Sequence, residues 1–145
     1  MLFRSTIGDF VCWDAANKVL VPVDVNVAGV TDSAANIAAS FAGVASQTEL
    51  SVNTNQGYPV FPAGYNGISV QVECLYNADI ASGAVDVGTL VKAVAGSPTT
   101  VATTTKVAGD AIGYVVAQYD NATTKVRVRL ISALFSPFNW SDNKN

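Results

Sequence analysis

The sequence predicts a mainly β fold, a compact antiparallel barrel or sandwich with one short helix and an extended C-terminal arm. Half of the 145 residues are hydrophobic and 13% are charged, so one domain can bury a sizeable core. Short runs rich in Val, Ile and Tyr alternate with turns rich in Gly, Asn, Asp and Ser. A β-domain is therefore expected over residues 1–132, with the arm at 133–145.

The first half of the chain is expected to form strands at residues 10–13, 19–25, 41–46 and 68–75. Pro22 interrupts the second run and lacks a ladder donor, so that strand is expected either to lie at a sheet edge or to start afresh after Pro22. In the last run, alternation places these side chains on one face: Ile68, Val70, Val72 and Cys74. Ala34–Ser40 reads as a short helix, capped at its start by Asp32 or Ser33.

The second half is expected to form a strand at 88–94, a short strand around Val101 and a β-hairpin over 109–132. The polar loop Asp120–Thr124 joins the two hairpin strands. Centring the register on this loop gives these pairs: Tyr119–Lys125, Ala117–Arg127, Val115–Arg129, Val116–Val128 and Tyr114–Leu130. One face is then apolar and buried, and the other carries a basic stripe of Lys125, Arg127 and Arg129.

Short sequence words recur in the two halves of the chain. Gly8-Asp-Phe-Val returns at position 88 as Gly-Thr-Leu-Val, a shift of 80. Phe41-Ala-Gly-Val-Ala returns at position 111 as Ala-Ile-Gly-Tyr-Val, a shift of 70. Each half closes with a strong strand, ISVQVECL or VRVRLI. Two β-modules, 1–75 and 80–132, would explain this pattern, and so would coincidence among short apolar words.

Composition bears on several functional classes. The net charge of −3 disfavours general nucleic-acid binding, which needs many cations to neutralise phosphates. The N-terminal residues do not resemble a signal peptide, and no apolar run approaches the roughly 20 residues of a membrane span. Cys12 and Cys74 fit neither a disulfide framework nor a metal pattern, so both are expected to be ordinary buried thiols.

Catalytic chemistry is not indicated. The chain has no histidine, and it contains no nucleophile elbow, P-loop or dinucleotide fingerprint. Aspartates occur singly, in segments read as turns: Asp9, Asp14, Asp24, Asp32, Asp79, Asp86, Asp110 and Asp120. Such residues more often bind their own backbone than act in catalysis. We therefore expect no enzyme, no cofactor and no metal site.

The basic stripe is the first candidate contact site. It holds three of the eight Lys and Arg residues of the chain. One interpretation is a solvated strand face whose charges deter edge-to-edge pairing. The other is a contact with carboxylates of a neighbouring subunit, to which the planar guanidinium of arginine is well suited.

Aromatic residues form the second group of candidates. Three lie in the C-terminal arm (Phe135, Phe138 and Trp140) and three in the irregular segment 47–67 (Tyr58, Phe61 and Tyr65). They either cap this subunit's own fold or dock on a neighbouring subunit, where aromatic anchors typically carry binding energy.

The words GDFVCWD, FAGVA, VGTLVK, AIGYVV and VRVRLI resemble the small head decoration, or cement, proteins of tailed bacteriophages. The resemblance covers nearly all of the chain up to Ile131. It implies a non-enzymatic β-rich protein, made in the host cytoplasm, that binds the major capsid protein on the capsid exterior and reinforces the shell, often as a homotrimer. The alternative is a carbohydrate- or receptor-binding β-module of a virion or cell surface.

Overall fold

The computed structural model describes residues 8–45 and 70–134, which form nine strands, one α-helix and a single 3-10 turn. The strands of the first sheet are β1 (Phe10–Asp14), β2 (Val19–Pro22), β3 (Phe41–Ala45) and β4 (Val70–Gln71). Those of the second are β5 (Glu73–Val85), β6 (Leu90–Ala93), β7 (Val101–Thr103), β8 (Gly113–Val115) and β9 (Tyr119–Ile131). The predicted mainly β fold with one short helix is confirmed.

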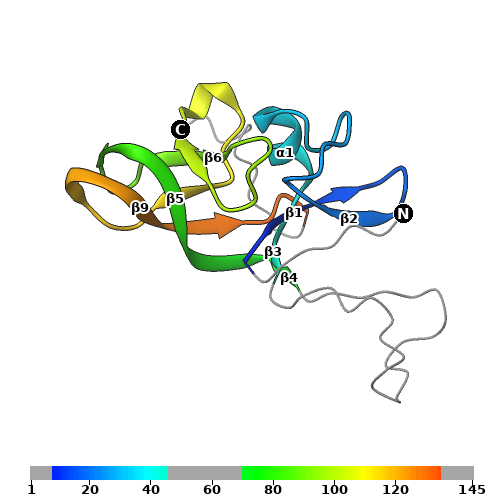
Figure 1. Ribbon diagram of the computed structural model, residues 1–145, viewed down its shortest axis with the longest axis horizontal. Helices are drawn as coiled ribbons and strands as arrows, with labels where there is room; N and C mark the ends of the chain where they lie inside the picture. Colours follow the sequence, from blue (N-terminus) through cyan, green and yellow to red (C-terminus); the bar gives the residue numbers. More distant parts are fainter. Residues whose placement is uncertain (1–7, 46–69, 135–145) are drawn as a thin grey trace, which may run out of the picture.

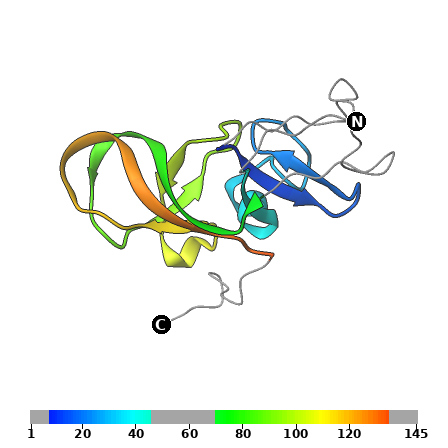
Figure 2. The same ribbon diagram turned by 90° about the horizontal axis from the view of Figure 1, so that it is seen from below.

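All neighbouring strands in both sheets are antiparallel, in the orders β2-β1-β3-β4 and β5-β9-β8-β6-β7. The two sheets lie at opposite ends of the molecule (Figure 1), and β5 and β9 curl together at one of these ends (Figure 2). As predicted, the strand that reaches Pro22 lies at a sheet edge, but it ends at Pro22 rather than at residue 25.

Helix α1 (Ala34–Ser40) lies between the sheets, packed against β1 and β6. Ser33 is its N-cap, because the Ser33 hydroxyl accepts a hydrogen bond from the Asn36 amide at 3.2 Å. Ile37 is its buried residue and joins the main core. The predicted helix is therefore confirmed, and the cap is Ser33 rather than Asp32.

One core joins the two sheets and α1. It contains Phe10, Cys12, Phe41 and Val44 from the first sheet, together with the inward side chains of β5 to β9. The Phe10 ring packs edge-on against Phe41, with ring centroids 6.1 Å apart, and lies 5.2 Å from the ring of Tyr76 on β5. Both cysteines are free thiols, Cys12 buried and Cys74 half-buried.

The two sheets share a strand order, since β2-β1-β3-β4 corresponds to β7-β6-β8-β9. Val11 pairs with Gly43, and Val91 pairs with Gly113. Phe10 likewise pairs with Val44, and Leu90 with Tyr114. The β1 and β6 residues of these pairs differ by 80 in number, and the β3 and β8 residues differ by 70. These are the shifts found between the repeated sequence words, so the words occupy matching places in the two sheets.

The two sheets stack in the same orientation, so that the inner face of one corresponds to the outer face of the other. Phe10 and Val44 of the first sheet face the shared core, whereas their counterparts Leu90 and Tyr114 are only half-buried, on the outer face of the second sheet. Conversely, Val11, Ala42 and Ala45 form a separate small cluster, while their counterparts Val91, Ile112 and Val115 line the shared core. The side that faces the shared core in the first sheet therefore faces outward in the second sheet.

The predicted hairpin pairs β8 with β9, but its register is wrong by one residue. Tyr114 pairs with Arg129 and Val115 with Val128, so Val115 points into the core. The residues expected as a loop, Asp120–Thr124, lie within β9 instead. Residues 120–124 are in a strand because β9 extends along β5 as far as the Tyr119–Val85 pair. The turn between β8 and β9 lies at residues 116–118 instead.

The predicted strand 68–75 is also corrected over its described part. Val72 separates β4 from β5 and is 40% exposed, so Val70 and Cys74 do not share one continuous face. Val70 packs on the small cluster of the first sheet, whereas Cys74 packs on the shared core. The chain thus passes from one sheet to the other at Val72 without a loop. Asp79, read as a turn residue, lies within β5.

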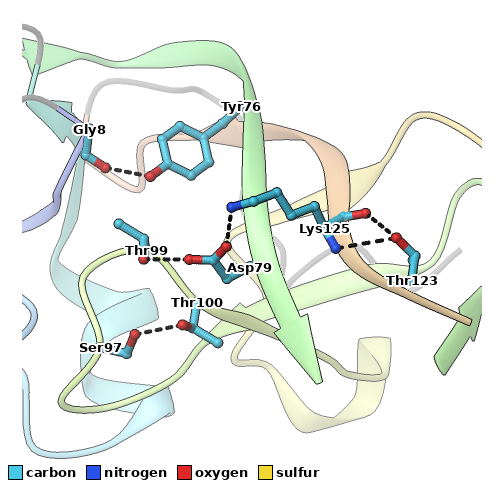
Figure 3. A network of polar contacts seen from close by, with 8 residues as sticks. All are labelled: Gly8, Tyr76, Asp79, Ser97, Thr99, Thr100, Thr123 and Lys125. Atoms are coloured by element: carbon cyan, nitrogen blue, oxygen red, sulfur yellow. Dashed lines mark hydrogen bonds and ion pairs between the residues drawn. The ribbon is translucent and has the colours of Figure 1, made fainter. Parts of the chain in front are cut away.

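Tyr76 ties β5 to the start of β1. Its hydroxyl donates a hydrogen bond to the Gly8 carbonyl at 2.7 Å (Figure 3). Burial, with smaller contributions from Asp79 and Asp9, raises the pKa of Tyr76 to about 12 from its ordinary value of 10.0. Because the neutral phenol is the favoured form, this stabilisation is complete below pH 10 and is lost as the pH rises toward 12.

Replacing Tyr76 with phenylalanine is expected to lower the free energy of unfolding at neutral pH by about 1 kcal/mol, the usual value of one such hydrogen bond. The variant should also lose less stability than the wild type between pH 10 and 12, which urea denaturation at both ends of that range would measure. Burial raises the pKa of Cys12 to about 11, so part of the alkaline loss remains in both proteins. Equal alkaline losses would contradict this account of Tyr76.

Candidate interaction surface

The basic stripe lies on the outer face of β9, as predicted. Lys125 and Arg127 are exposed and Arg129 is half-buried, while Val126, Val128 and Leu130 between them are buried in the core. The alternation follows from the period of two along a strand. The sequence therefore placed these three cations correctly on one face, although it placed the wrong β8 residues opposite them.

Two of the three cations have carboxylate partners within the chain. Lys125 forms an ion pair with Asp79, its cross-strand partner on β5. Arg129 donates to Glu73 through Nε at 2.8 Å and also through Nη2. The hydrogen bond from Lys125 lowers the pKa of Asp79, and the bond to Glu73 raises the pKa of Arg129. Because the paired side chains remain open to solvent, these ion pairs contribute little to stability.

Arg127 differs from its two neighbours on the stripe. Its cross-strand partner on β5 is Asn77, and no carboxylate pairs with its guanidinium among the residues that the structure describes. Its backbone amide is used, donating to the Tyr119 hydroxyl at 2.9 Å. Among the described residues, the guanidinium of Arg127 is thus the one cation of the stripe without a carboxylate partner.

A polar network holds Asp79 in position. Its second carboxylate oxygen accepts from the Thr99 hydroxyl at 2.9 Å, and its backbone amide donates to the Thr99 carbonyl at 3.0 Å (Figure 3). The loop that carries Thr99 is braced by Ser97, which donates to the Thr100 hydroxyl at 2.6 Å. From the same loop, the Pro98 carbonyl accepts from the Phe10 amide at 2.8 Å, linking β1 to β5.

The outer face also contains apolar side chains in register with the charges. A cross-strand row of Leu90, Tyr114, Arg129 and Leu75 runs across β6, β8, β9 and β5. Leu75 is 49% exposed. Glu73, Leu75 and Asp79 were not among the site residues predicted from the sequence. The sequence signal that could have identified them is the alternation of polar and apolar residues in ECLYNAD. This alternation continues past residue 75, where the strand was predicted to end.

The six aromatic candidates are outside the described residues. They are Tyr58, Phe61, Tyr65, Phe135, Phe138 and Trp140. Their proposed contacts therefore stay predictions, as does the C-terminal arm.

Within residues 8–45 and 70–134, no three His, Cys, Asp or Glu side chains lie close enough together to hold a metal ion. No helix of the same described part has the length and apolar character needed to cross a membrane. The exposed large hydrophobic residues described there are all aliphatic: Val72, Leu75, Val87, Val107 and Leu134.

Comparison with known proteins identifies no relative: no protein-family model matches the chain, and no curated protein or solved structure matches it significantly.

Proposed function

We propose that this chain is a structural virion protein that binds the outer surface of a tailed-phage capsid and stabilises it by bridging major capsid subunits. One observation carries the proposal: the sequence words behind the resemblance are the matching strands of the two sheets. GDFVCWD and FAGVA contain β1 and β3, and VGTLVK, AIGYVV and VRVRLI contain most of β6, all of β8 and the end of β9. The resemblance therefore concerns the scaffold itself.

The proposed mechanism is adhesion through many weak contacts. An exposed ion pair or a single partly exposed leucine contributes little alone, under about 1 kcal/mol for the ion pair. Repetition over a symmetric shell makes the sum large, because each later contact forms at a high effective concentration. A homotrimer would present three copies of each contact to the capsid at once. The chain would work on the capsid exterior without transforming any molecule.

Capsids from the phage that encodes the chain test this proposal. Virions with the gene intact should contain the protein in a fixed ratio to the major capsid protein. Capsids from a gene-deleted phage should bind the added recombinant chain to saturation in a sedimentation assay, and should then release DNA at a higher temperature. A chain that stays in the supernatant, or that is absent from intact virions, would overturn the proposal.

The self-association part of the proposal has a separate test. Light scattering after size exclusion should give a species of about three times the 15.0 kDa mass of one chain. Deleting residues 133–145 should shift this species toward the monomer if the arm docks on a neighbouring subunit. A monomeric full-length chain would remove the homotrimer from the proposal.

A further inference from the structure

The outer face of the second sheet, hereafter the outer face, has a composition suited to docking. It contains the cross-strand row Leu90, Tyr114, Arg129 and Leu75, the stripe residues Lys125 and Arg127, and Glu73, Asn77 and Asp79 of β5. Apolar and charged side chains lie next to one another on adjacent strands, as in the mixed composition of interfaces that form between soluble proteins.

The matching side of the first sheet is already an interface. Phe10 and Val44 occupy the places that correspond to Leu90 and Tyr114, and both are buried against the second sheet. The corresponding strands therefore pack this side on another protein layer in the first sheet and leave it only half-buried in the second.

The charge of the outer face differs in sign from that of the chain. On β5 and β9, three cations and two carboxylates give it one net positive charge, and the ion pair of Lys92 with Asp110 next to β6 adds none, whereas the chain as a whole carries −3. The excess is Arg127, because Lys125 pairs with Asp79 and Arg129 with Glu73. A guanidinium flanked by an amide and a half-exposed leucine fits a carboxylate next to an apolar side chain.

We propose that the outer face docks an acidic, partly apolar segment of the major capsid protein, with Arg127 binding a carboxylate and Leu75 contacting an apolar side chain. This inference rests on the function proposed above and adds the surface and the chemistry of the partner. A protein carboxylate fits better than nucleic acid, because Glu73 and Asp79 on the same face would repel a row of phosphates.

Charge reversal at Arg127 tests the inference on gene-deleted capsids. Arg127→Glu should weaken capsid binding at least about tenfold, because it places a carboxylate opposite a carboxylate. Arg127→Lys should retain part of the affinity, and Leu75→Asn should weaken binding with little change in its salt dependence. Lys18→Glu is the matched control: it makes the same charge change at an exposed turn of the first sheet and should alter binding less than about twofold.

The outcomes separate the two proposals. If the wild type binds capsids and Arg127→Glu binds equally well, the outer face is not the docking surface, while the decoration function stands. If the wild type itself does not bind, both proposals fall. Thermal unfolding verifies that each variant is folded, and Arg127→Gln, which removes the charge without reversing it, replaces Arg127→Glu should that variant fail to fold. Arg127→Gln should still bind more weakly than the wild type.

Discussion

Replacing Gly113 with alanine is expected to lower the free energy of unfolding by about 3 kcal/mol and the midpoint of thermal unfolding by about 10 °C. A Cβ at this position would overlap the carbonyl oxygen of Arg129 and lie 3.0 Å from its carbonyl carbon and 3.1 Å from the Leu130 Cα. These are backbone atoms of β9, so no rotamer change relieves the overlap. The β8–β9 pairing must open instead.

Gly83 provides the matched control for this variant. It also lies in a strand of the second sheet, but a Cβ there meets no atom nearer than the Ala81 carbonyl oxygen at 3.9 Å. Gly83→Ala should therefore change stability by less than about 1 kcal/mol, in either direction. Thermal and urea unfolding of both variants give the comparison. Similar losses in the two would mean that the close approach at Gly113 does not limit the pairing of β8 and β9.

Gly43 extends the prediction to the other sheet. It occupies the place that matches Gly113, and an added Cβ would overlap the Gln71 carbonyl oxygen of β4 and lie 2.8 Å from Val70 Cγ1. Its φ of +144° adds backbone strain for any residue with a side chain. Gly43→Ala should thus be at least as destabilising as Gly113→Ala. The two glycines recur because the same close approach of strands recurs.

Much of the fold could be read from the sequence because alternation and turn residues act locally. Burial of Val126, Val128 and Leu130 between exposed cations followed directly from the period of two. The proline in the second strand likewise indicated an edge. These features depend on neighbouring residues alone, so a single sequence carries them.

Register and strand partners could not be read in the same way. The hairpin was misplaced by one residue because polar residues 120–124 resemble a loop, although β5 provides them with a strand partner distant in sequence. The same long-range pairing brings Glu73 and Asp79 beside Arg129 and Lys125. Two of the three cations of the stripe are therefore paired with carboxylates of the same chain. Only the folded structure distinguishes Arg127 from them as the cation without such a partner among the described residues.

Replacing Phe10 with alanine is expected to lower the free energy of unfolding by about 3–5 kcal/mol, the range for deleting a buried aromatic ring. Phe10 is fully buried, and its ring contacts Phe41 of the first sheet and Tyr76 of the second. The cavity would lie where the two sheets join, so neither sheet can close it alone. Urea denaturation would measure the loss, with Phe10→Leu as a milder variant that should retain the fold.

Leu90→Ala is the control that tests the stacking of the modules. Leu90 occupies the same register position as Phe10, but its side chain lies half-buried on the outer face, so its truncation should lower stability by only about 1 kcal/mol. A large loss at Phe10 with a small loss at Leu90 follows only if one face is inward in the first sheet and outward in the second. Equal losses would mean that both modules bury this face, and the outer face would then not be free to receive a partner.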